Sequence, residues 1–161
     1  MTRPLWAPWR VVYIEQTGSE DGCVFCLEAE DALGDDSLVV HRGDTTIVLL
    51  NKFPYSSGHL MVSPLRHVGS LDELDDGEAL ELHRLTVRSL EALRAISNPD
   101  AFNVGWNLGF AAGGSIAQHL HEHVVPRWSG DTNFMPVLAD VKVVPEHLLA
   151  TRDRLREAFA A

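Results

Sequence analysis

The chain has 161 residues, of which 45% are hydrophobic and 22% charged, and this composition indicates a single globular domain with a core of its own. The formal net charge of -10 argues against sequence-independent binding to nucleic acid, which requires clustered lysines and arginines. The opening residues contain no apolar run long enough for a signal peptide or a membrane span, so we expect a cytoplasmic protein without a membrane partner.

The first 22 residues are predicted to form an extended arm, in which Trp6 and Trp9 pack on the body or on a second subunit. Cys23 and Cys26 follow in C-x-x-C spacing. In a cytosolic chain this spacing favours metal or redox chemistry over a structural disulfide. A short helix is expected near residues 27–33.

The rest of the chain predicts strands separated by hairpins, loops and one long helix. Residues 37–41 and 45–50 resemble the two strands of a hairpin around Arg42-Gly43-Asp44. The other predicted strands are 59–63, stopped by Pro64, then 101–107 and 118–126. Leucines at helical spacing predict a helix over 77–96, and a last helix covers 145–159. The solvated acidic start of the long helix is expected at Asp72, Glu73, Asp75, Asp76 and Glu78. The expected fold is α+β, with a largely antiparallel sheet of about five strands, a long helix and a C-terminal helix in one domain over residues 1–161.

Three of the eight histidines, His119, His121 and His123, alternate along the predicted fifth strand. Successive side chains of a strand point to opposite faces, so the three imidazoles should share one face and Glu122 should lie on the other. Charged imidazoles repel when stacked, so the arrangement needs a chemical reason. Two reasons are open: a metal site made by the His-x-His pairs, or a neutral imidazole that attacks phosphorus while its neighbour stabilises the phosphate charge.

The residues before this stretch favour phosphate chemistry. Gly113, Gly114 and Ser115 lie four to six residues before His119. Glycines let backbone N–H groups approach an anion closely, and the Ser115 hydroxyl adds a donor. A Gly-Gly-Ser tripeptide is weak evidence by itself, but its position directly before the alternating histidines makes it part of the candidate site.

The sequence resembles the histidine-triad family, whose motif is His-φ-His-φ-His-φ-φ with φ apolar. The motif here reads His119-Leu120-His121-Glu122-His123-Val124-Val125, and Glu122 departs from it. The resemblance extends from the C-x-x-C to past Arg127. It includes Leu49–Lys52, Gly58–Val62 and Pro64–Val68, which are similar to the family's nucleotide-binding strands and following loop. The opening residues and the stretch Val124–Leu148 resemble a bacterial branch of diadenosine tetraphosphate phosphorylases.

The resemblance implies a role for each matching residue. His121 is the implied nucleophile that takes the nucleotidyl group, and His123 contacts the phosphate. Further substrate contacts are implied for Ser115 and Gly114 at the phosphate oxygens or leaving group, Asn107 at the phosphate chain, Asn51 at the ribose hydroxyls and Gln118 at phosphate. The implied partners are an adenine nucleotide or dinucleoside polyphosphate and inorganic phosphate, together with a second copy of the chain in a homodimer or larger homo-oligomer.

In several branches of the family, a C-x-x-C, a histidine after the third strand and the first triad histidine bind a structural zinc ion. The matching residues are Cys23, Cys26, His67 and His119, a set suited to a closed tetrahedral site. The alternative is two free thiols and two hydrogen-bonded histidines. No magnesium motif is visible, so any Mg²⁺ is expected to arrive with the polyphosphate.

The reaction implied is nucleotidyl transfer in two steps, in which His121 attacks an α-phosphorus and a second nucleophile then removes the nucleotidyl group. With inorganic phosphate as acceptor, diadenosine tetraphosphate gives ADP and ATP. With water as acceptor the chain is a hydrolase. Two other classes stay open: a metallohydrolase with the triad as ligands of a catalytic zinc, and a nucleotide-binding module without turnover.

Overall fold

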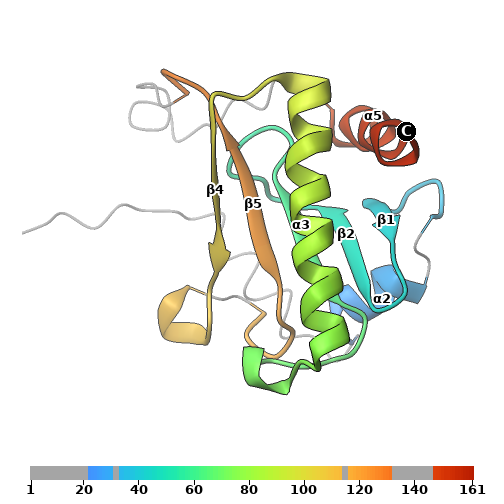
Figure 1. Ribbon diagram of the computed structural model, residues 1–161, viewed down its shortest axis with the longest axis vertical. Helices are drawn as coiled ribbons and strands as arrows, with labels where there is room; N and C mark the ends of the chain where they lie inside the picture. Colours follow the sequence, from blue (N-terminus) through green and yellow to red (C-terminus); the bar gives the residue numbers. More distant parts are fainter. Residues whose placement is uncertain (1–21, 31–32, 114–115, 132–146) are drawn as a thin grey trace, which may run out of the picture.

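The computed structural model describes residues 22–30, 33–113, 116–131 and 147–161 (Figure 1). The predicted N-terminal arm therefore lies outside the described residues, apart from Gly22, and so do Gly114 and Ser115. Among the helices that are described, none combines the length and the apolar content needed to cross a membrane.

The five described strands form one antiparallel sheet, as the sequence predicted. They are β1 (Val39–Arg42), β2 (Thr46–Leu50), β3 (Leu60–Pro64), β4 (Ala101–Trp106) and β5 (Glu122–Arg127). Their order in the sheet is β1-β2-β3-β5-β4, so β4 lies at an edge. The long helix α3 (Asp76–Ser97) crosses one face, and the C-terminal helix α5 (Leu148–Ala160) packs beside α3 and β1 (Figure 1). The predicted α+β class is confirmed.

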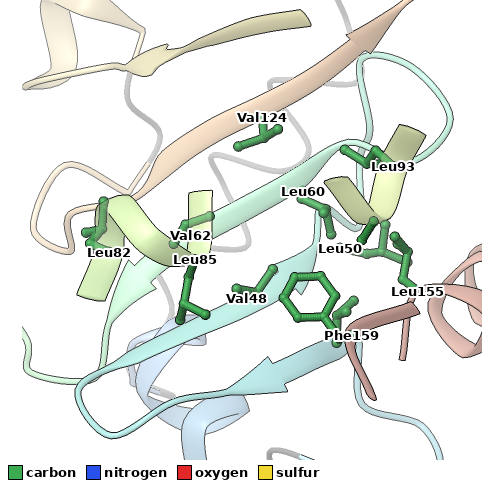
Figure 2. Packing of buried hydrophobic residues seen from close by; sticks show 12 residues of the cluster. Val48, Leu50, Leu60, Val62, Leu82, Leu85, Leu93, Val124, Leu155 and Phe159 are labelled. Carbon is green, nitrogen blue, oxygen red and sulfur yellow. The ribbon is translucent and has the colours of Figure 1, made fainter. Parts of the chain in front are cut away.

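The main apolar core lies between the sheet and these two helices (Figure 2). Alternate strand residues supply the sheet side, because a strand presents every second side chain to one face. From the sheet these are Val48, Leu50, Leu60, Val62 and Val124, and from the helices Leu82, Leu85, Leu93, Leu155 and Phe159. Leu50, Leu60, Leu93 and Leu155 are almost fully buried. This face holds the apolar area that stabilises the fold.

The start of α3 is an exposed acidic turn as expected at Asp72, Glu73, Asp75 and Asp76, and the expectation was wrong only at Glu78. Asp75 caps the helix by accepting from the backbone N–H of Glu78, and the Glu78 carboxylate accepts from the N–H of Asp75 in return. Glu78 is buried, and its pair with Arg66 at 2.7 Å offsets the cost of removing the carboxylate from water. The hydrogen bonds and charge of Arg66 lower the pKa of Glu78. The residue next to the candidate ligand His67 is thus tied to the first turn of α3.

On the opposite face of the sheet lies the short helix α2 (Val24–Glu30), which starts three residues earlier than the predicted helix. The reason is Phe25, which is buried against Val39, Ile47 and Leu49. These strand residues alternate with those that face α3. A second, smaller core therefore fixes the C-x-x-C turn to the sheet.

The fifth strand also begins later than expected, at Glu122 instead of Gln118. The residues before it are held by other contacts: the backbone N–H of Leu120 donates to the Val68 carbonyl, and the Leu120 carbonyl accepts from Ser63 Oγ. His119 and His121 consequently precede the strand, and only His123 lies within it. The prediction that all three sit in one regular strand was wrong, because contacts from the end of β3 and from Val68 replace the ladder.

Candidate active site and metal centre

A row of ring contacts runs along the α2 face of the sheet, although the triad segment is only partly a strand. His67 meets His119 with ring centroids 5.0 Å apart, and His121 meets His123 at 5.0 Å. Phe25 bridges the two pairs, because its ring packs on both His119 and His121. His59 extends the row beyond His123 at 5.1 Å. The three triad imidazoles therefore lie on one side of the sheet, as predicted, joined by these ring contacts.

His121 is held in one tautomer. Its Nδ1 lies 2.8 Å from the backbone carbonyl of His119, and a carbonyl can only accept, so Nδ1 carries the proton. The neutral ring therefore has its lone pair on Nε2. His121 is 7% exposed, and this burial lowers the pKa of its imidazole against the opposing effect of the carbonyl hydrogen bond. The result is a neutral imidazole with an unprotonated Nε2, as a nucleophile requires.

His59 is a site residue that the sequence reasoning missed. It is fully buried, and its Nδ1 accepts from the backbone N–H of Tyr55 at 3.1 Å. Its proton then lies on Nε2, which is 3.0 Å from Nδ1 of His123. A neutral His123 that accepts there carries its own proton on Nε2. A lone histidine at the start of a strand has no periodic partner in the sequence, so no local pattern could identify it.

The structure places both predicted asparagines beside these imidazoles. Asn107 lies directly after β4, and its amide group is 3.3 Å from Nε2 of His123. With the His123 proton on Nε2, the amide oxygen is the atom that can accept from it, since two N–H groups cannot bond to each other. Asn51 follows β2, and its amide nitrogen is 3.4 Å from Nδ1 of His59. The Asn51 oxygen accepts from the N–H of Phe53, which shapes the loop between β2 and β3. Tyr55 in this loop packs its ring on His59, 4.8 Å away.

The remaining predicted phosphate contacts lie in the segment between β4 and His119. Gln118 is exposed in the turn before His119. Gly113 ends a short 3-10 helix (Phe110–Ala112) with φ of 90°, a left-handed conformation that favours glycine. Gly114 and Ser115 lie outside the described residues. Their proposed contacts with phosphate therefore stay predictions.

Cys23, Cys26, His67 and His119 converge as a second centre, with ligand atoms within 4.8 Å of one another. Nδ1 of His119 is 3.2 Å from Cys23 Sγ, and Nδ1 of His67 is 3.4 Å from Cys26 Sγ. Zinc bonds of about 2.0–2.3 Å in a tetrahedron place neighbouring ligand atoms roughly 3.3–3.8 Å apart, so these spacings fit a zinc ion. The predicted set of residues can hold a metal.

The hydrogen bond of His119 gives an independent test of this fit. Its Nε2 lies 2.9 Å from the Pro64 carbonyl and must carry the proton, which leaves the Nδ1 lone pair directed at the thiols. This is the tautomer that a metal ligand needs. Burial and the neighbouring Cys23 raise the pKa of the Cys26 thiol to about 11. A bound cation would offset this cost by stabilising the thiolate.

The described residues place the triad histidines in different roles. Of the three, His119 belongs to the group of described residues whose ligand atoms could hold a metal ion, together with Cys23, Cys26 and His67. Nδ1 of His121 is directed at a backbone carbonyl, and Nδ1 of His123 at His59. This arrangement favours the nucleophile interpretation of the triad over a metal ion bound by all three histidines.

Comparison with known proteins gives consistent results. A family model described as the HIT domain matches residues 34–130. The AP-4-A phosphorylase of Mycobacterium tuberculosis is 40% identical over 163 residues, which cover 97% of this chain and 84% of that protein. A histidine triad nucleotide-binding protein from Sulfolobus tokodaii shares the fold with a TM-score of 0.69 and 24% identity, over 86% of this chain and 92% of that one. A Zn-bound histidine triad family protein from Mycobacterium smegmatis shares it with the same score and identity, over 86% and 94%.

Proposed function

The chain belongs to the HIT domain family, and from this premise we propose that it is a nucleotidyl transferase that cleaves diadenosine polyphosphates with inorganic phosphate as acceptor. The observation that carries nucleotidyl transfer is the tautomer of His121, which leaves Nε2 unprotonated inside a buried site. The choice of substrate and acceptor is supported by the 40% identity to the AP-4-A phosphorylase of M. tuberculosis over nearly the whole chain.

In the first step, Nε2 of His121 attacks the α-phosphorus of diadenosine tetraphosphate. The N–P bond forms as the bond to the bridging oxygen breaks, and ATP leaves with the electron pair of that bond. The leaving polyphosphate is a weak base, so the need for a general acid is modest. In the second step, inorganic phosphate attacks the adenylylated His121, which releases ADP and restores the imidazole. Splitting one transfer into two easier ones is the advantage of a covalent intermediate.

His123 and His59 would stabilise the charge of the transferring phosphate. His59 donates to Nδ1 of His123, so a neutral His123 carries its proton on Nε2, next to the Asn107 amide, and would donate it to a phosphate oxygen beside His121 when substrate binds. The backbone N–H of Tyr55 and the burial of His59 hold this chain of donors in one direction. Preorganised donors of this kind cost no reorganisation when the transition-state charge develops.

The other contacts follow from the family resemblance. Asn107, next to His123, would position the phosphate chain, and Asn51 would bind the ribose hydroxyls from the end of β2. Gly114, Ser115 and Gln118 would hold phosphate oxygens or the leaving group. Any Mg²⁺ would enter with the polyphosphate.

We infer a structural zinc ion at Cys23, Cys26, His67 and His119, where the donor atoms and the tautomer of His119 fit it. When bound, zinc would supply a fixed anchor for the segment that precedes His121, and no chemistry on the substrate. His119 links the two centres, because its Nδ1 faces the thiols while its carbonyl accepts from His121.

We also infer a homodimer or larger homo-oligomer, from the family resemblance. In the part of the chain that the structure describes, the edge strand β4 pairs on one side only, with β5. It carries Val104, which is 45% exposed, and Phe110 in the following segment is 74% exposed. An exposed strand edge with apolar side chains is suited to pairing with another chain. We further propose that residues 1–161 form one domain and that the protein is cytoplasmic.

The test is product analysis after incubation with diadenosine tetraphosphate, with and without inorganic phosphate. ADP and ATP in equal amounts, formed only when phosphate is present, are expected. AMP and ATP formed regardless of phosphate would assign the alternative, a hydrolase that uses water. Nucleotide binding without any product, and without an acid-labile adduct on His121, would contradict the enzyme assignment and indicate a binding module.

A further inference from the structure

Phe25 lies between the two cysteines and contacts the nucleophile directly. Its ring stacks on His121 with centroids 4.8 Å apart and planes 28° apart, and it packs on His119 at 5.1 Å and 41°. Phe25 is 1% exposed and rests against Val39, Ile47 and Leu49 from β1 and β2. The ring is therefore fixed by the sheet and by α2, and it supports one face of the His121 imidazole.

Two further contacts hold His121. The hydrogen bond from Nδ1 to the His119 carbonyl fixes one atom of the ring, and the His123 ring lies 5.0 Å away with planes 79° apart. A hydrogen bond at one atom opposes a tilt of the imidazole out of its plane less directly than a stacked ring does. In-line attack requires the Nε2 lone pair to point at phosphorus, and small errors in this alignment reduce rates strongly.

We propose that Phe25 is a positioning residue for the nucleophile, and that the C-x-x-C turn orients His121 by holding this ring in place. For its chemical consequence the inference rests on the proposed nucleotidyl transfer. It assigns the turn a function beyond metal binding: the two ends of the Cys23–Cys26 turn face the metal centre, while the residue between them faces the active site.

The chain offers a matched control in Phe159. This residue is 6% exposed, stacks on His41 at 5.3 Å and 25°, and belongs to the core on the other face of the sheet. Phe25→Leu and Phe159→Leu thus remove the same ring from the same kind of pair. A purely structural role predicts the same pattern for both variants, a lower Tm with kcat retained.

The experiment uses the full chain loaded with zinc, with metal content measured for each variant. Single-turnover quench with labelled diadenosine tetraphosphate gives the rate at which the His121 adduct forms, and steady-state assays give kcat and KM. For Phe25→Leu we expect the adduct rate and kcat to fall by on the order of tenfold or more, with KM nearly unchanged. For Phe159→Leu both rates should stay within about twofold of the parent chain.

A second readout does not depend on activity. The ring current of Phe25 should shift the carbon-bound proton resonances of His121 upfield in NMR spectra, and Phe25→Leu should move them downfield while Phe159→Leu leaves them in place. If Phe25→Leu does not fold, Phe25→Met takes its place, because methionine fills the site with an unbranched apolar side chain and no ring.

Three outcomes would overturn the inference: unchanged His121 resonances in the Phe25 variant, an adduct rate equal to that of Phe159→Leu, or a lost rate that added zinc restores. If the parent chain forms no adduct while the resonances shift as expected, the proposed function fails and the contact between Phe25 and His121 stands. If the parent chain forms the adduct and the Phe25 variant matches it, only the inference about Phe25 fails.

Discussion

The two faces of the sheet use the same strands for different purposes. On the α3 face, Val48, Leu60 and Val124 pack with the leucines of α3 in the main apolar core. On the α2 face, the alternate residues Ile47 and Leu49 form a smaller core, beside which the histidine rings lie in contact. The comparison teaches that strand alternation separates the residues that supply stability from those positioned for chemistry.

The separation is sharpest within β5. Glu122 points toward α3, where its carboxylate accepts from Thr86 Oγ1 at 2.5 Å, while its neighbour His123 points to His59 on the other face. Substitutions on the α2 side should therefore change activity more than stability, and those on the α3 side should do the reverse. The following variants test this rule, from the largest expected effect to the smallest.

Replacing the nucleophile should give the largest change. We expect His121→Ala to lower kcat by on the order of 10³-fold or more, since the covalent intermediate cannot form. Its Tm should change by only a few degrees, a small effect for a side chain at the rim of the core. The control is His83→Ala, because His83 is exposed on α3. Turnover in His121→Ala that approaches the parent rate would remove the nucleophile assignment.

A core variant on the α3 face should show the opposite pattern. Leu93 is fully buried against the sheet, so Leu93→Ala should lower the free energy of unfolding by about 2–5 kcal/mol through lost burial and a cavity. Urea titration measures this change. At a temperature where the variant is folded, its kcat should stay within about twofold of the parent value. A large loss of kcat in the folded variant would mean that the two faces are not separate.

The metal centre should affect stability and activity together. Cys23→Ser should lose bound zinc and lower the free energy of unfolding by on the order of 2 kcal/mol or more. Val24→Ser changes the neighbouring half-exposed residue without touching the cluster, and should keep the metal. Elemental analysis and thermal unfolding are the measurements. No zinc in the parent chain, with equal Tm for both variants, would contradict the metal proposal.

The smallest effect is expected at the residue that departs from the family motif. Glu122→Val restores an apolar side chain on the α3 face. The Thr86 hydroxyl has a single proton and also lies 3.0 Å from the Leu82 carbonyl, so it keeps an acceptor when Glu122 is replaced. The stability should change by less than about 1 kcal/mol, and kcat by less than about twofold. A tenfold loss of kcat would instead show that a side chain of β5 on the α3 face affects the histidines on the α2 face.

Local patterns in the sequence were sufficient for most of the fold. The hairpin around Gly43, the leucine spacing of α3 and the β-branched runs each reflect interactions between near neighbours, so these elements could be predicted. The convergence of Cys23 and Cys26 with His67 and His119 was predicted only through the family resemblance, since no local rule brings together residues so far apart.

The contacts that the sequence could not supply are those between distant segments. The role of Phe25 depends on its ring stack with His121, which lies far away in the sequence. A phenylalanine between two cysteines of a C-x-x-C gives no local pattern that predicts this contact. The late start of β5 depends on contacts of Leu120 with Val68 and Ser63. The substrate contacts of Gly114 and Ser115 stay predictions, since both residues lie outside those described.

The position of the metal centre along the chain has a consequence for folding. Cys23 and His119 are 96 residues apart in sequence, so an ion bound between them would close a loop that spans more than half of the chain. A link across about 100 residues removes conformational freedom from the unfolded chain worth on the order of 4–5 kcal/mol in the chain-entropy view. Contacts this distant form late in folding, because the loop must close before they contribute. The ion would thus act as a reversible cross-link. While bound, it would keep the segments that carry Cys23 and His119 from separating, and so lengthen the lifetime of the folded chain.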